Sequence, residues 1–229
     1  MSTLIAIEGI DGAGKGTQAT NLVQRLNAAG TSANSIQFPR YSSTTFGTAI
    51  GDFLNGKFGS LDEVHPQLAA VLYAGDRFES LSVLNEAMNS HEVVVLDRFT
   101  GSNLAHQCAK LAGEDREKLQ QWIDHVEHVV FGLPRPQLNV LIDISSEWSR
   151  KLVSRKGERD YTEDEADIHE ANLPYLEKVR RCYLQIAESR ADWRVVSSLD
   201  ESGELRAIDQ IGAAIDELVL PVVRQGLRP

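Results

Sequence analysis

A glycine-rich stretch near the amino terminus has residue types suited to binding a phosphorylated ligand. Gly9, Gly14 and Lys15 match the spacing G-x-x-x-x-G-K. Glycines let successive backbone N–H groups point into one concavity, a following helix adds partial positive charge, and the lysine can reach the β- and γ-phosphates of a nucleotide. A glycine-rich turn without a ligand explains the glycines but not the lysine. The predicted phosphate-binding residues are Gly9, Ile10, Asp11, Gly12, Ala13, Gly14, Lys15, Gly16 and Thr17.

A second group of chemically capable side chains follows the apolar run Val93–Leu96, which ends in Asp97 and Arg98. A carboxylate at the carboxyl end of a buried strand faces the crevice where ligands bind in open α/β sheets, so Asp97 could hold Mg²⁺, directly or through water. Arg98 could grip an acceptor phosphate with both arms of its guanidinium. The alternative is an ordinary Asp–Arg pair on the surface at a strand end.

Thr17 is the second candidate for magnesium. The residue after the lysine of such a motif is usually Ser or Thr, whose hydroxyl binds the Mg²⁺ of the nucleotide. Here that position is Gly16, and the hydroxyl comes one residue later. Coordination of Mg²⁺ by Thr17 is therefore an expectation that departs from the usual motif.

Short apolar runs and helical spacings indicate the elements that must position these groups. Buried parallel strands are expected where four to six apolar, partly β-branched residues occur together. Helices are expected over Thr17–Ala29, which Gly30 ends, over Pro66–Asn89, and twice within Gly101–Phe131. This alternation predicts a doubly wound α/β sheet of about five parallel strands flanked by helices, in one domain spanning residues 1–229. The expected strands are Leu4–Glu8, Ala33–Gln37, Val93–Asp97, Asn139–Ile144 and Trp193–Ser197.

The overall composition limits the classes of partner. The chain has 229 residues, with 23 Lys and Arg against 33 Asp and Glu, so its formal net charge is −10. Such a charge argues against broad binding to nucleic acid or an acidic membrane. We find no signal peptide and no apolar run long enough to span a membrane, which favours a cytoplasmic protein. Cys108 and Cys182 lie far apart in sequence and are expected to be reduced thiols in the core.

One segment departs from this acidic average. Arg150, Lys151, Arg155, Lys156 and Arg159 fall within ten residues. A charge run is commonly a solvated surface. Gly157 in its middle favours a mobile loop, and the segment from about 150 to 166 is a candidate basic lid.

Taken in order, the motifs resemble those of the thymidylate kinase family over nearly the whole chain. They are Glu8–Lys15, Phe38–Tyr41, Asp76–Arg77 and Asp97–Gln107. The resemblance implies the fold of P-loop NTPases and transfer of the γ-phosphoryl of ATP to dTMP, giving dTDP. It also implies Mg²⁺ with ATP as the phosphate donor, and a homodimer, for which the apolar spacing from Leu68 to Leu84 offers a candidate helix.

The resemblance also implies roles for individual residues. Arg40 and Arg98 would approach the phosphate of dTMP, and Phe38, followed by Pro39, would stack on thymine. Asp11 would lie near the sugar and the metal. Because Gly12 stands where some members carry an arginine, Arg155 and Arg159 resemble lid arginines that neutralise charge on the transferring group. Residues implied to read the polar edge of the base are Arg77, Ser102, Asn103 and Gln107.

Three further positions leave alternatives open. Asp167 and Glu170 would share one helix face, where they either contact the acceptor sugar or are merely solvated. His106 stands where the family usually has a tyrosine that helps to exclude ribonucleotides, so it either takes over that contact or is a tolerated change in the pocket wall.

Two other functions remain as alternatives. Gly14–Gln18 and Phe38–Arg40 also resemble adenylate kinase, so another nucleoside monophosphate specificity is one of them. A non-catalytic nucleotide-binding module is the other, although the retained arginines argue against it. A signalling GTPase is excluded, because the guanine-reading tetrapeptide Asn-Lys-x-Asp does not occur in the sequence.

Overall fold

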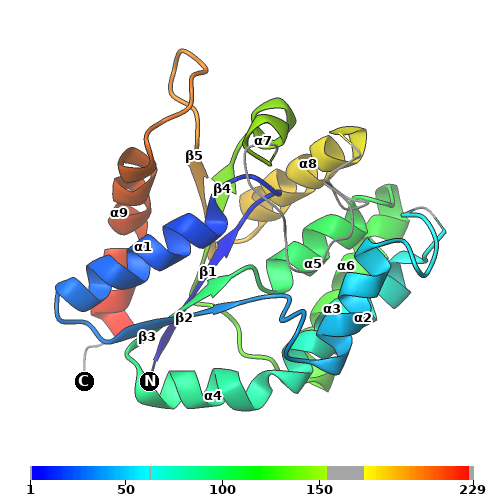
Figure 1. Cartoon of the computed structure of the whole chain (residues 1–229), viewed down its shortest axis with the longest axis horizontal. Coiled ribbons are helices and arrows are strands. Elements are labelled where there is room, and N and C mark those ends of the chain that lie inside the picture. Colours follow the sequence, from blue (N-terminus) through cyan, green and yellow to red (C-terminus); the bar gives the residue numbers. More distant parts are fainter. Residues whose placement is uncertain (1, 62, 154–172, 227–229) are drawn as a thin grey trace.

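The structure, a computed structural model, describes residues 2–61, 63–153 and 173–226 (Figure 1). The strands are β1 (Thr3–Glu8), β2 (Ala33–Gln37), β3 (Val93–Asp97), β4 (Leu138–Asp143) and β5 (Trp193–Ser197). The helices are α1 (Lys15–Ala28), α2 (Thr45–Leu54), α3 (Pro66–Glu79), α4 (Leu81–Ser90), α5 (Thr100–Cys108), α6 (Gly113–His125), the π-helical turn η1 (Val126–Val130), α7 (Ser146–Val153), α8 (Leu173–Ser189) and α9 (Ile208–Gly226).

Five strands in the described part of the chain form one parallel sheet, in the order β2-β3-β1-β4-β5. The prediction of a doubly wound α/β sheet is confirmed, and the expected strands agree with the observed ones to within one residue at each end. The agreement has a physical cause. Helices cover β1, β3 and β4 on both faces, so nearly every residue in these strands is apolar.

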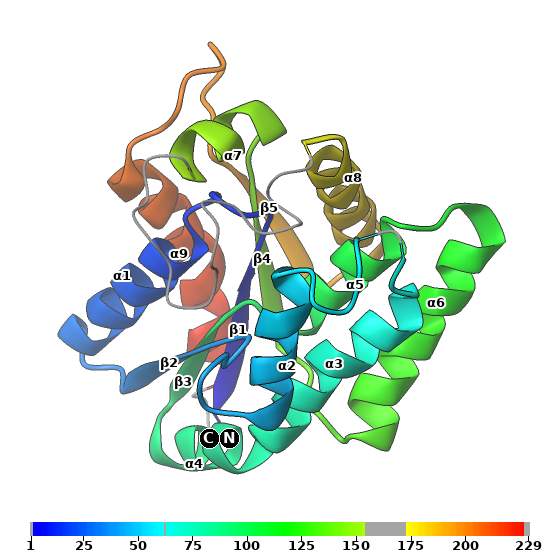
Figure 2. The same ribbon diagram turned by 45° about the vertical axis from the view of Figure 1, so that its right-hand side comes forward.

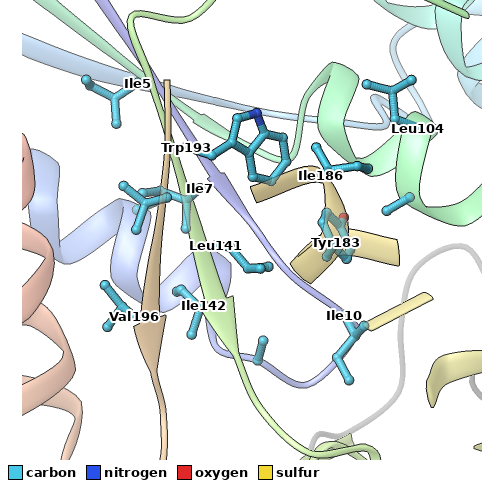
Figure 3. Packing of buried hydrophobic residues seen from close by; sticks show 14 of the residues in the cluster. Ile5, Ile7, Ile10, Leu104, Leu141, Ile142, Tyr183, Ile186, Trp193 and Val196 are labelled. Carbon is cyan, nitrogen blue, oxygen red and sulfur yellow. The ribbon is translucent and has the colours of Figure 1, made fainter. Parts of the chain in front are cut away.

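Side chains of the central strand β1 alternate between two hydrophobic clusters. Ile5 and Ile7 belong to a large cluster that includes Leu22 of α1, whereas Leu4 and Ala6 pack in a second cluster with α4. Figure 1 shows α1 and α9 together on one side of the sheet. Figure 3 shows the large cluster where it reaches β4, β5 and α8. The two faces of β1 therefore fix both helical layers.

Helices α2, α3, α5 and α6 form a group beside the sheet, as Figure 2 shows. The predicted pair of helices between residues 101 and 131 is confirmed as α5 and α6, which continues into η1. The segment Pro66–Asn89 is helical as predicted, but it breaks into α3 and α4 at Ser80, whose hydroxyl donates to the Asp76 carbonyl oxygen at 2.8 Å. Helix α2 was not expected from the sequence.

The strand order brings the two groups of predicted site residues to one edge. β1 lies between β3 and β4, so the connections after β1 and β3 start from neighbouring carboxyl ends and run to opposite sides of the sheet. Ile7 of β1 is level with Asp97 of β3 in the parallel register. The glycine-rich stretch and the pair Asp97–Arg98 therefore meet in the position where ligands bind in open α/β sheets.

None of the helices within the described ranges is both long enough and apolar enough to cross a membrane. Cys108 and Cys182 are buried free thiols, as expected.

Candidate active site

The glycine-rich stretch forms a phosphate loop between β1 and α1. Gly9, Gly12 and Gly14 have φ values of +148°, +76° and +85°, a region that side chains disfavour. Gly12 also has no room, because a Cβ there would lie 2.6 Å from the carbonyl oxygen of Ser149. Gly14 is the N-cap of α1, so the first N–H groups of the helix face the loop. The motif glycines are thus required by the backbone.

Lys15 is the buried cation of this loop. Its side chain is folded back, and Nζ donates to the carbonyl oxygen of Ile10 at 2.8 Å. Burial, together with the nearby positive charge of Arg98, lowers the pKa of Lys15 to about 8. A bound phosphate group would add negative charge beside this ammonium and favour its charged form.

Asp97 lies against the first turn of α1. The residue is 9% exposed, and a Cβ on Gly16 would lie 2.9 Å from its Oδ2 atom. A side chain at position 16 would force the carboxylate of Asp97 to move. Thr17, on the first turn of the same helix, is exposed.

Arg98 connects the end of β3 to the phosphate loop. It has φ of +65°, a left-handed conformation that is uncommon for a residue with a side chain. Its Nη1 donates to the Gly9 carbonyl oxygen at 3.1 Å and to Ser102 Oγ at 3.3 Å. Its Nη2 forms an ion pair with Asp11. The predicted acceptor-side arginine therefore contacts the predicted donor loop.

Glu8 is a functional residue that the sequence analysis did not single out. This fully buried carboxylate accepts hydrogen bonds from Phe99 N at 2.9 Å, Ser102 Oγ at 2.6 Å and Tyr183 Oη at 3.2 Å. Burial raises its pKa above the ordinary value. Because it binds the residue after Arg98, Glu8 holds the strained turn in place. A charged residue that closes an apolar strand was the available signal.

Arg40 and Phe38 follow β2. The backbone N–H of Arg40 donates to Asp76 of α3, at 3.1 Å to Oδ2, and its Nη1 donates to Ser80 Oγ at 3.3 Å. Phe38 precedes a cis peptide bond to Pro39. Phe38 is 1% exposed and packs against Phe99, with ring centroids 5.7 Å apart. The structure thus shows Phe38 as a core residue, and its stacking on thymine stays a prediction.

Arg77 and Asn103 meet at a buried carboxylate. Arg77 Nε and Nη2 donate to Glu127 Oε2 and Oε1, at 2.7 and 2.6 Å. Asn103 Nδ2 donates to Glu127 Oε1 at 2.8 Å and to the Ala70 carbonyl oxygen at 3.0 Å. Gln107 of the same helix α5 is fully buried. Glu127 was not predicted, because no sequence pattern connects it with Arg77, 50 residues earlier, or with Asn103, 24 residues earlier.

His106 lies beside two tyrosines. It is 7% exposed, and the hydroxyl of Tyr175 donates to its carbonyl oxygen at 2.9 Å. The ring of Tyr183 meets it edge-on, with centroids 6.3 Å apart. His106 therefore lies in an aromatic wall between α5 and α8.

The start of the predicted lid is anchored on the phosphate loop. α7 ends at Val153, and its Ser149 Oγ donates to the Asp11 carbonyl oxygen at 2.6 Å. Four predicted site residues lie outside the described residues: Arg155, Arg159, Asp167 and Glu170.

A phosphate loop that contains a lysine, after the central strand of a parallel sheet, with an arginine reaching it from the neighbouring strand, is the arrangement of a P-loop protein that binds nucleoside triphosphates. Comparison with known proteins narrows this class. The family model for thymidylate kinase matches residues 7–207, so the chain belongs to the thymidylate kinase family.

Individual relatives agree with this assignment. The chain is 31% identical over 207 residues to the thymidylate kinase of Mycobacterium tuberculosis (strain ATCC 25618 / H37Rv), covering 89% of this chain and 95% of that one. It is 27% identical over 208 residues to the human thymidylate kinase, covering 90% and 86%. The solved structure of a thymidylate kinase from Candida albicans, an enzyme of broad substrate specificity, superimposes with a TM-score of 0.70 at 26% identity, covering 96% of this chain and 92% of that one.

The reaction is the ATP-dependent phosphorylation of dTMP to dTDP, which makes the chain a phosphotransferase. Neither alternative from the sequence, another nucleoside monophosphate kinase or a non-catalytic module, is favoured by these likenesses.

Proposed function

We propose that the two phosphates meet at the carboxyl ends of β1 and β3, with ATP on the phosphate loop and the phosphate of dTMP on Arg98 and Arg40. The observation that carries the proposal is the position of Arg98. Its guanidinium is bonded at once to Gly9, to Asp11 and to Ser102, so a phosphate that it binds lies next to the donor loop. Lys15 serves the donor phosphates at the same place.

The chemical step needs little from side chains except position and charge. An oxygen of the dTMP phosphate attacks the γ-phosphorus of ATP, the bond from that phosphorus to the β–γ bridging oxygen breaks, and ADP leaves. A phosphate oxygen is already a nucleophile, so no general base is required. Arg155 and Arg159 would neutralise the charge that develops on the γ-phosphoryl, and Asp167 and Glu170 would contact the acceptor sugar.

Mg²⁺ is the cofactor that we propose to accompany ATP. Among the described residues there is no group of three or more His, Cys, Asp or Glu that could hold a metal. This fits Mg²⁺, which is usually bound by one or two carboxylates, waters and substrate phosphates rather than by a protein cage. Asp97 and Thr17, both beside the first turn of α1, would hold it, with Asp11 close by. The ion would neutralise phosphate charge.

We place the base of dTMP between α3 and α5. Arg77, Asn103 and Gln107 are buried there, with Ser102 one turn from His106. Amides and a guanidinium suit the carbonyl and imide groups of thymine. Phe38 with Pro39 would form one wall.

A homodimer is the assembly that we propose. Phe78 of α3 is 48% exposed, and Val129 and Val130 of η1 are 65% and 60% exposed. Phe78 packs against Phe131, the residue that follows η1, with ring centroids 4.9 Å apart, so both α3 and η1 present exposed apolar side chains close to this contact. Light scattering on the purified chain would give about twice the monomer mass, and Val130→Glu would give a monomer.

The buried thiols are compatible with a cytoplasmic enzyme.

The site assignment is tested by measuring ADP release with ATP·Mg²⁺ and a panel of nucleoside monophosphates. We expect dTMP to be the best acceptor, and dUMP to be used about 10- to 200-fold less well, since only a methyl group differs. Arg98→Ala should raise the KM for dTMP far more than the KM for ATP, while Arg181→Ala on the exposed face of α8 changes neither. Equal loss for both substrates would contradict the acceptor role of Arg98.

The lid assignment has its own test. The double variant Arg155→Ala, Arg159→Ala should lower kcat by about 10³-fold or more, because arginines that stabilise the transferring phosphoryl contribute about 10³ to 10⁵. A change in KM alone would contradict it.

A further inference from the structure

Glu127 is a buried carboxylate for which the reaction has no direct use. It lies in the π-helical turn η1 and is fully buried. Single π-helical turns inside helices occur frequently at functional sites, because the extra residue redirects a side chain. Here the side chain is directed at Arg77 of α3 and Asn103 of α5.

We propose that Glu127 fixes which edge of a pyrimidine base the enzyme accepts, by holding Arg77 as a hydrogen-bond donor and Asn103 as an acceptor. The inference rests on the proposed base pocket. Glu127 itself is a positioning residue and need not touch the substrate.

The amide of Asn103 has only one possible orientation in this environment. Its Nδ2 group has two N–H donors, and both face acceptors, the carbonyl oxygen of Ala70 at 3.0 Å and Glu127 Oε1 at 2.8 Å. A flipped amide would place its own oxygen against both of these oxygens. Oδ1 therefore points the other way, where it is buried and has no hydrogen-bond partner among the described residues. Oδ1 is thus an acceptor that awaits a donor.

The guanidinium of Arg77 is oriented by the same carboxylate. Nε and Nη2 make a two-point contact with Glu127, at 2.7 and 2.6 Å, and the side chains are 2% and 0% exposed. A two-point contact fixes the plane of a guanidinium, which leaves Nη1 to donate on the side away from Glu127. The pocket therefore presents one donor, from Arg77, and one acceptor, from Asn103.

This pattern matches an imide and opposes an aminopyrimidine. Thymine and uracil carry an N3–H donor next to a C4 carbonyl acceptor. Cytosine carries an N3 acceptor next to a C4 amino donor, so both positions are reversed. A site built to hydrogen-bond a substrate rejects an analogue that leaves its buried groups unpaired by about 10⁴ to 10⁵. Glu127 is the residue that keeps the pocket in the orientation that selects thymine.

The test compares dTMP with 5-methyl-dCMP, which share the sugar, the phosphate and the methyl group and differ only at this edge. We expect the ratio of their kcat/KM values to be about 10⁴ or more in the wild type. In Glu127→Gln the new amide N–H₂ group faces N–H donors in either orientation, Arg77 Nε in one and both Arg77 Nη2 and Asn103 Nδ2 in the other. We therefore expect the ratio to fall at least tenfold. Glu127→Asp withdraws the carboxylate by one methylene group, so it should also lower the ratio, by less than Glu127→Gln does.

Asp124→Asn is the matched control. Asp124 lies one turn earlier, on α6, and is paired with Arg190 at 2.7 Å, so the variant loses an ion pair of the same helix without touching the pocket. Its substrate ratio should equal that of the wild type. If Glu127→Gln lowers kcat/KM equally for both substrates, Glu127 has only a structural role and the inference is overturned.

Two further outcomes separate the inference from the base pocket on which it rests. If Asn103→Ala leaves the substrate ratio unchanged, the proposed pocket itself is wrong. If Asn103→Ala lowers the ratio and both Glu127 variants preserve it, only the inference fails. Should Glu127→Gln not fold, which thermal melting would show, Glu127→Asp decides: an unchanged ratio in that variant overturns the inference.

Discussion

We expect Arg98→Gly to be more stable than Arg98→Ala, although both variants lose the proposed contact with the phosphate of dTMP. At a φ of +65° a residue with a Cβ atom is strained by about 1–2 kcal/mol. Glycine relieves this strain but has about 0.5–1 kcal/mol more backbone entropy to lose on folding. The difference leaves Arg98→Gly about 0.5–1 kcal/mol more stable than Arg98→Ala. Both variants lose the same ion pair with Asp11, so that loss cancels.

Thermal melting and activity, measured together, test this reasoning. For a chain of this size, 1 kcal/mol corresponds to about 2–4 °C in Tm, so Arg98→Gly should melt about 1–4 °C above Arg98→Ala. Both should show a similarly raised KM for dTMP. The matched control is Arg181 inside α8, where glycine should be about 1 kcal/mol less stable than alanine. If Arg98→Ala melts at or above Arg98→Gly, the left-handed turn does not store strain.

Three further predictions concern the phosphate loop and its support. The pKa of Lys15 in the folded protein is lowered to about 8, so without ATP this side chain loses its charge above that pH. The affinity for ATP, measured by fluorescence titration, should therefore fall between about pH 8 and 10, with a slope approaching tenfold per pH unit. An affinity that does not change with pH in this range would contradict the assignment of Lys15. Gly16→Ala, whose Cβ would lie 2.9 Å from Asp97 Oδ2, should displace that carboxylate and lower kcat. Stability should change little, because the carboxylate can shift and alanine favours the helix by up to about 1 kcal/mol. An unchanged kcat in a rate assay would argue against the close approach. Glu8→Ala leaves the buried N–H of Phe99 without an acceptor, at a cost of about 1–3 kcal/mol. Glu8→Gln keeps one carbonyl oxygen for this N–H, and the hydroxyls of Ser102 and Tyr183 can rotate to accept from the new amide instead of donating. Glu8→Gln should therefore be the more stable variant in urea unfolding.

The pH dependence of stability from Glu8 has a definite sign. Its pKa is raised in the folded state, so between the unfolded value and the folded value the native protein binds more protons than the unfolded chain. The free energy of unfolding from this group therefore decreases as the pH rises through that window and is constant above it. Glu8→Gln should remove this decrease from a series of urea titrations.

Local physics made much of the fold predictable. A strand buried on both faces must be apolar throughout, so Val93–Asp97 could be placed from its composition alone. The phosphate loop was equally predictable, because Gly9, Gly12 and Gly14 have positive φ values that other residues disfavour. In contrast, α2 was missed although Thr44 caps it and Phe46, Ile50 and Phe53 have helical spacing. Two glycines within its ten residues lower the intrinsic helix propensity and hide the pattern.

The supporting carboxylates of the site could not be predicted in the same way. Glu8, Asp76 and Glu127 owe their roles to partners that are distant in sequence, as with Phe99, 91 residues after Glu8. Charged residues are rarely buried without partners, but a sequence shows neither the burial nor the partner. Arg77 illustrates the result: alone it suggests a pair on a helix surface, whereas the structure shows it 2% exposed on Glu127.

The contact between Gly12 and α7 has a consequence for how such enzymes diverge. A side chain at position 12 would collide with the carbonyl oxygen of Ser149, at 2.6 Å, and with the methyl Cγ2 of Val153, at 3.1 Å. An arginine cannot be introduced there by a single substitution, because the backbone of α7 occupies its path. Position 12 and α7 should therefore change together, and relatives with an arginine at position 12 should show a displaced or shortened α7. Moving the positive charge from the lid to the phosphate loop would therefore need a change in α7 as well as the substitution at position 12.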